Sequence, residues 1–256
     1  MALPNVLRLV YRNLVVNMDP GSLVILVGLP SMYLVFMGYG FQSLVSSTTA
    51  SPDSYIRFLA PGILAFQTVI AGTVGGSMLW MDRRLGMLAQ LLSGPFTRIQ
   101  YLLGIILASV VMGLAGTTLL LAVAYLMLHS LPLTAVDAAV MYGSVVVGSL
   151  FFGALMLLIA ALVRSNNAYN SIQILVLFFV NFASTVFYPL SSSLPSVIRA
   201  MFVVNPLTYV ADNVRAGFLG VYSLPDGYEF ALLVAESAVV LVVAARAYMR
   251  ANISFE

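Results

Sequence analysis

Long stretches without charge constrain this chain more than any other feature of its sequence. No charged residue lies between Phe58 and Met81, and none lies between Ile99 and Val136 when His129 is counted as neutral. About 20 apolar residues in a helix suffice to cross the hydrocarbon core of a bilayer. The runs are also too continuously apolar for the alternating strands of a membrane barrel. The sequence therefore predicts an all-α membrane protein.

The composition supports one membrane domain over residues 1–256. Hydrophobic residues make up 61% of the chain and charged residues 8%, whereas soluble domains carry about 25% charged residues. Little of the chain is left for a soluble domain.

Missing residue types exclude several kinds of chemistry. The chain has no Cys, so it has no disulfide, thiolate metal site or thiol nucleophile. All its basic residues are Arg, and without Lys it can form neither a standard phosphate-binding P-loop nor a Schiff base. Its one His excludes His-cluster metal sites. We expect no catalytic site, cofactor or metal in this chain, so an ion gradient or a separate ATPase must supply energy for any driven process.

Six segments are apolar and long enough to be membrane spans. They cover residues 22–40, 55–80, 100–128, 137–163, 170–188 and 229–248. Pro30 is expected to kink the first. In the second, Gly72 and Gly76 form a GxxxG motif that permits close helix packing, either inside one subunit or between subunits.

An amphipathic helix is expected before the first span, over residues 3–19. Its apolar face would carry Leu3, Val6, Leu7, Val10 and Leu14, and its polar face Asn5, Arg8 and Arg12. Such a helix lies in the membrane interface with its arginines toward anionic headgroups.

A short basic segment, residues 82–95, separates the second and third spans. Asp82 can cap a helix that carries leucines at helical spacing, and Gly94-Pro95 can end it. The residues predict an amphipathic helix that is either an ordinary interfacial loop or a docking helix for a soluble partner.

The segment at 190–228 is apolar but repeatedly broken by proline. We expect two short helices there, at 194–204 and 206–219, separated at Asn205-Pro206. Broken apolar backbone is tolerated in a membrane where it packs in protein or lines a cavity, so these helices are predicted to be re-entrant.

The arginines predict the orientation of the bundle. With six spans both termini lie on one side, and that side holds eight of the eleven arginines. Because positive loops stay inside, the termini and residues 82–95 are expected in the cytoplasm and residues 190–228 outside.

With these segments placed, the chain resembles the permease subunits of type-2 ATP-binding-cassette (ABC) exporters, particularly daunorubicin-type drug exporters. Three motifs carry the resemblance along essentially the whole chain. They are Phe58-Leu59-Ala60-Pro61-Gly62-Ile63-Leu64; Asp82-Arg83…Gly86…Leu91-Leu92…Pro95…Arg98…Leu103-Gly104; and Phe187-Tyr188-Pro189…Leu194-Pro195…Asn205-Pro206-Leu207-Thr208-Tyr209…Asp212…Arg215. The second departs from the family, which commonly has an acidic residue after Asp-Arg and a charge in the following helix. Here Arg84 and uncharged residues such as Ala89 stand instead.

The resemblance implies a protein of the prokaryotic plasma membrane in which two permeases bind two ABC ATPase subunits. ATP and Mg would bind the ATPases, which would push on the 82–95 coupling helix and open an outward path. It implies export of amphiphilic drugs, as in multidrug efflux and antibiotic resistance, or alternatively transport of lipids or lipid-linked glycans. Membrane lipid is an expected partner and nucleic acid is not.

Candidate site residues fall into two groups. Those for coupling to the ATPase are Asp82, Arg83, Arg84, Gly86, Leu88, Leu91 and Pro95, although the arginines could instead reflect the positive-inside bias. Those for a substrate path or gate are Asn181, Thr185, Tyr188, Asn205, Pro206, Asp212, Arg215 and Glu236.

Two acidic residues of the second group have alternative interpretations. Glu236 lies at span depth, where it is either a cavity group for cations or protons or the partner of Arg215 or Arg199. Asp212 and Arg215 are expected to pair within one helical turn. Asn181 and Thr185, with Ser184, Gln67 and Gln173, are expected to hydrogen bond between helices.

Two other functional classes fit the sequence less well than a permease does. An intramembrane protease needs a Ser–His dyad at span depth, and His129 is expected in an outer turn. An ion-coupled transporter usually places several ionisable groups at the midplane, where Glu236 alone qualifies.

Overall fold

The computed structural model describes residues 2–17, 20–45, 54–129, 134–191 and 194–251, and these contain helices and no strand. The helices run in the order α1 (Ala2–Val16), α2 (Pro20–Leu23), α3 (Leu29–Met32), α4 (Gly38–Val45), α5 (Ser54–Arg84), α6 (Met87–Ser93), α7 (Arg98–Leu128), α8 (Ala135–Leu162), α9 (Asn166–Phe182), α10 (Ser196–Val204), α11 (Pro206–Leu219) and α12 (Leu224–Arg250). The prediction of an all-α fold is confirmed for this part of the chain.

Five helical stretches within the described ranges are long and apolar enough to cross a membrane. They are Pro20–Phe41, Tyr55–Arg84, Arg98–Leu128, Ala135–Leu162 and Leu224–Arg250. The protein is therefore a multi-pass membrane protein. The predicted fifth span, 170–188, corresponds to α9, which has 17 residues and ends at Phe182. Ser184 donates to the Asn181 carbonyl in the turn that follows the helix.

The first of these stretches is not a regular α-helix. Two π-helical turns, Val24–Gly28 and Tyr33–Met37, lie on either side of α3, which contains Pro30. The irregularity expected at Pro30 therefore appears as widened turns.

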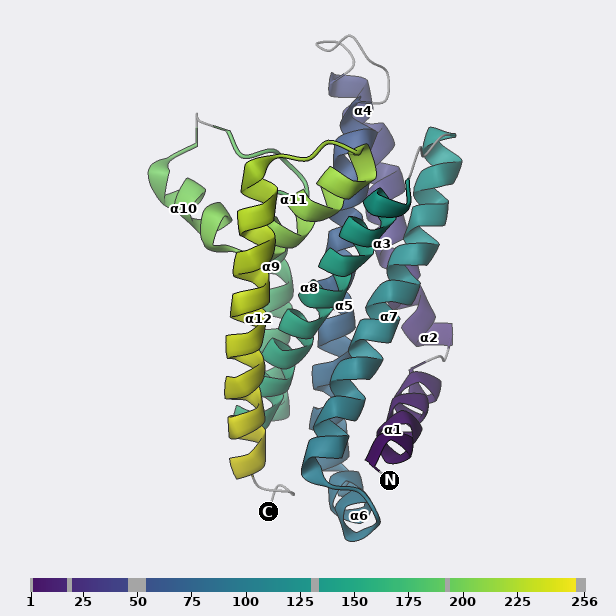
Figure 1. Ribbon diagram of the computed structural model, residues 1–256, viewed down its shortest axis with the longest axis vertical. Helices are drawn as coiled ribbons and strands as arrows, with labels where there is room; N and C mark the ends of the chain where they lie inside the picture. The colour runs from purple at the N-terminus through teal and green to yellow at the C-terminus, as the bar shows by residue number, and fades with distance from the viewer. Residues whose placement is uncertain (1, 18–19, 46–53, 130–133, 192–193, 252–256) are drawn as a thin grey trace.

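Helix α5 forms the centre of the bundle and packs against α7, α8 and α11 (Figure 1). Its GxxxG glycines face α8, where a Cβ on Gly72 would lie 2.6 Å from the Phe152 backbone and one on Gly76 would lie 2.7 Å from the Met156 Cβ. No larger residue fits there without displacing α8. The motif thus serves packing inside one chain, one of its two predicted uses.

The chain passes along the bundle so that its ends come together. Figure 1 shows α1, α6 and the carboxyl end of α12 at one end, which we call the α6 end, and α10 and α11 at the other, which we call the α10 end. Helix α9 begins beside Trp80 and ends beside Asn205, so it runs from the α6 end to the α10 end. The first turn of α1 and the last turn of α12 therefore lie at the same end of the bundle.

Helix α1 packs along α7, where the Cβ of Leu9 fills the space above Gly104. Its buried apolar residues include Val6, Leu9 and Val10, whereas Leu7 is 59% exposed. Leu9, and not the predicted Leu7, contacts α7, and Leu7 lies on the part of α1 that no other described element covers.

Candidate functional site

A carboxylate at the α6 end joins three helices. Asp82, in the last turn of α5, accepts hydrogen bonds from Arg12 of α1 at 2.6 and 2.7 Å and from the Tyr101 hydroxyl of α7 at 2.6 Å. Asp82 is 7% exposed and Tyr101 is fully buried. The bond to Asp82 raises the pKa of Arg12. Two predictions were wrong here: Asp82 does not cap a helix start, and Arg12 faces a carboxylate rather than lipid headgroups.

Two other arginines at this end bind the carboxyl ends of helices. Arg83 donates to the carbonyls of Ala160 and Ala161 in the last turns of α8, at 2.6 and 3.1 Å. Arg98 donates to the Met249 carbonyl of α12 at 2.7 Å. Unpaired carbonyls and the negative end of the helix dipole favour a cation at such positions. These arginines fasten α5 and α7 to the ends of α8 and α12.

Helix α6 is connected to α5 by one tight turn. Gly86 has φ +71°, a left-handed conformation that suits glycine, and it separates Arg84 from Met87. The helix is shorter than the predicted 82–95 because α5 continues through Arg84. Asn5 of α1 donates to the carbonyl of Pro95, so α1 also holds the loop after α6.

The predicted coupling residues differ in exposure. Leu88 is 2% exposed and Arg83 is 3% exposed, so both stabilise the bundle end and cannot present a docking surface in this conformation. Leu91 is half-buried, whereas Ala89 and Gln90 are exposed.

At the α10 end, one amide links α9 to α11. The Asn205 side chain caps α11 by accepting from the Leu207 N–H, and its NH₂ group donates to the carbonyls of Val180 and Ala183, both at 2.7 Å. Pro206 takes the first helical position, where no N–H is needed. The predicted helix pair at 194–204 and 206–219 matches α10 and α11 within two residues.

A second charged cluster lies beside this link. Arg215 pairs with Asp212 one turn earlier, as predicted, and also donates to the Thr185 carbonyl at 2.8 Å. Its guanidinium lies 4.1 Å from the centre of the Phe58 ring. The Thr185 hydroxyl donates to Asp212 at 2.8 Å. The cluster therefore joins α5, α11 and the turn after α9.

The remaining predicted gate residues do not join this cluster. Tyr188 donates to the Phe182 carbonyl and borders a cavity of about 360 Å³ between α9 and α10. Of the two alternatives for Glu236, the pair with Arg215 or Arg199 is not formed, because Arg215 is taken by Asp212 and Glu236 Oε2 has no hydrogen-bond partner in the described structure. Asn181 Oδ1 is likewise buried without a partner there.

Predicted hydrogen bonds between helices are present at two positions. Gln67 of α5 donates to the Leu26 carbonyl at 2.6 Å, and Ser77 of α5 donates to Gln173 of α9 at 3.4 Å. His129 is exposed and ends α7 in a left-handed conformation, as a turn residue.

Sequence reasoning missed two parts of these sites. One is the Arg12–Asp82–Tyr101 cluster, which could have been sought because an acid directly after an uncharged run needs a partner. The other is the contact of Tyr222 with Asp137 at the α10 end. This hydrogen bond raises the pKa of Tyr222 to about 12.

The geometry can be compared with known proteins. No curated protein matches the chain. The family model described as ABC-2 type transporter matches residues 6–219, from α1 through both charged clusters to the end of α11. Because this match covers most of the sequence, the chain belongs to the ABC-2 type transporter family.

Proposed function

We propose that this chain is the membrane-spanning subunit of an ATP-driven exporter that moves amphiphilic molecules out of the cell. Two permease copies and two ATPase subunits form the complex, and ATP and Mg bind the ATPases. The family match carries this proposal. It is consistent with the absence of Lys, which leaves the chain without a standard phosphate site of its own.

In this proposal the bundle has six spans, with α9 as the fifth. Its 17 residues are about 25 Å long, which is within the range of short membrane helices. The α6 end faces the cytoplasm because it carries most of the arginines. Helices α10 and α11 are re-entrant from the outer side.

Helix α6 is the contact that receives the ATPase movement. Its buried Leu88 and the two-residue link Leu85-Gly86 make it follow α5 closely. Asp82 and Arg83 connect that movement to α1, α7 and α8. The exposed Ala89 and Gln90, with Pro95 in the next loop, are the surface that the ATPase touches.

The outward gate is the Thr185–Asp212–Arg215 cluster with its Asn205 support. Opening a path beside α11 requires its bonds to α5 and to the α9 turn to rearrange. Glu236, which has an unpartnered oxygen on α12, attracts cationic amphiphiles to this half of the bundle.

Co-expression with an ABC ATPase subunit tests the proposal. We expect the two to purify together, and candidate amphiphiles to stimulate ATP hydrolysis in proteoliposomes. Ala89→Trp, on the exposed face of α6, should abolish co-purification. Ala200→Trp, at an equally exposed position on α10, is the matched control and should not. Solute movement by the purified chain alone would show that the proposal is wrong.

A further inference from the structure

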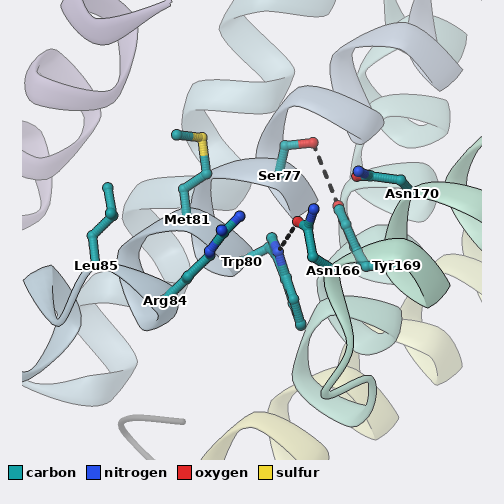
Figure 2. A pocket seen from close by; sticks show the side chains of 8 residues that line it. All are labelled: Ser77, Trp80, Met81, Arg84, Leu85, Asn166, Tyr169 and Asn170. Carbon is teal, nitrogen blue, oxygen red and sulfur yellow. Dashed lines mark hydrogen bonds between the residues drawn. The ribbon is translucent and has the colours of Figure 1, made fainter.

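A groove at the α6 end combines polar side chains with apolar ones, and Arg84, a predicted coupling residue, lies in it. It lies between the last turns of α5 and the first turns of α9 and has a volume of about 300 Å³ (Figure 2). The residues that line it are Ser77, Trp80, Met81, Arg84, Leu85, Asn166, Tyr169 and Asn170.

The inner wall of the groove is held rigidly. The Trp80 and Tyr169 rings stack with centroids 5.1 Å apart and planes 5° from parallel. The Trp80 indole N–H donates to Asn166 Oδ1 at 3.0 Å. Because this bond occupies the Asn166 oxygen, it fixes the orientation of the amide and leaves its NH₂ group as a donor.

The groove is rich in hydrogen-bond donors and contains no carboxylate. Figure 2 shows the Arg84 side chain extending along the groove toward Asn166, with the Asn170 amide across from it. Arg84 is exposed, and neither ion pair found in the described ranges includes it. A guanidinium with two amides offers five or more N–H donors and a net positive charge, which suits an oxyanion such as a phosphate group.

The surroundings favour a phosphate that belongs to a lipid. Met81 and Leu85, 56% and 67% exposed, flank the groove with apolar surface. Trp and Tyr side chains beside arginines are typical of the level at which a helix leaves the hydrocarbon core. Basic pockets between membrane helices at this level bind anionic headgroups. A soluble anion would gain nothing from the apolar residues.

We propose that this groove binds the headgroup phosphate of an anionic phospholipid from the leaflet at the α6 end, with Arg84 as the main charged contact. The lipid then bridges α5 and α9 beside the Trp80–Asn166 hydrogen bond that already joins them.

Lipid titration of the purified protein, with bound lipids counted by native mass spectrometry, tests this proposal. We expect phosphatidylglycerol to bind in preference to phosphatidylcholine.

Arg84→Gln should reduce that preference about fivefold, because one basic residue near a lipid surface contributes about 1 kcal/mol. Arg84→Lys should retain most of it. Arg250→Gln, an exposed arginine at the same end on α12, is the matched control and should leave it unchanged. Thermal unfolding of each variant shows whether it is folded.

Four outcomes would overturn the proposal. The two lipids could bind equally, or inorganic phosphate alone could displace phosphatidylglycerol at millimolar concentration, which would indicate a site for soluble anions. Equal losses in the Arg84 and Arg250 variants would indicate a general surface charge. If Arg84→Gln abolished co-purification of the ATPase and left lipid preference intact, the groove would be a protein contact.

Discussion

The two ends of the bundle each carry one ion pair among the described residues, and the pairs are built differently. At the α6 end, Arg12 and Asp82 are 70 residues apart and join separate helices. At the α10 end, Asp212 and Arg215 lie in one helical turn. The Arg12 side chain is 29% exposed and that of Arg215 is 14% exposed.

The two arginines should therefore respond differently when their acidic partners are removed. Without its partner, Arg12 can turn toward water, and what is lost is the connection of α1 to the bundle. Arg215 cannot leave as easily, because it lies between α5 and the turn after α9. Losing its partner therefore leaves the less exposed of the two arginines without a counter-charge, which costs more than leaving a more exposed arginine so.

Asp212→Ala is the change with the largest expected effect. It leaves Arg215 without a counter-charge. The pair is partly buried, with side chains 14% and 26% exposed, so the cost should approach but not reach the about 3–5 kcal/mol of a fully buried pair. We expect a large fall in thermal stability in detergent. Asp212→Asn should cost less, because the amide oxygen can still accept from Thr185. A thermal midpoint for Asp212→Ala close to that of the unmodified protein would show that Arg215 reaches solvent.

Asp82→Ala should cost less, about 2–3 kcal/mol, because Arg12 can be rehydrated while the buried Tyr101 hydroxyl loses its acceptor. Unlike Asp212→Ala, this change should increase hydrogen exchange over residues 2–17, since α1 loses its charged bond to α5. The matched Asp212→Ala variant should leave exchange in α1 unchanged. Equal exchange in the two variants would mean that α1 is held by its contacts with α7 alone.

The same contrast explains what could be predicted from the sequence. Local signals worked: Asn205-Pro206 predicted the boundary between α10 and α11, and the three-residue spacing predicted the Asp212–Arg215 pair. Apolar length predicted five long helices to within a few residues of their ends.

Contacts between distant segments could not be predicted in this way. Nothing near Asp82 in the sequence points to Arg12, because their meeting depends on how α1 packs on α7. For the same reason Leu88 was assigned to a docking surface although it is buried. Periodicity identifies the apolar face of a helix but not the element that covers it.

Removing one hydroxyl at each end sharpens the comparison. Tyr101→Phe and Thr185→Val each remove one donor to a carboxylate and keep both ion pairs. A hydrogen bond to a charged group contributes about 1.5–3 kcal/mol, and we expect losses near the lower value because each acid keeps its arginine. The measurement is the thermal midpoint of each variant. A loss at one end that equalled the loss from removing the acid would mean that the hydroxyl, and not the arginine, is the main partner of that carboxylate.

The smallest expected effect comes from salt. Between 0.1 and 1 M ionic strength the Debye length falls from about 10 to about 3 Å, which screens exposed pairs far more than buried ones. Hydrogen exchange in α1 should therefore increase modestly with salt, whereas exchange in α11 should not, because Arg12 is the more exposed arginine. The Asp82→Ala variant supplies the control: with the pair already absent, its α1 should exchange at a rate that does not depend on salt. If salt instead increased hydrogen exchange in α11 and left exchange in α1 unchanged, the Asp212–Arg215 pair would be the one that salt screens more strongly.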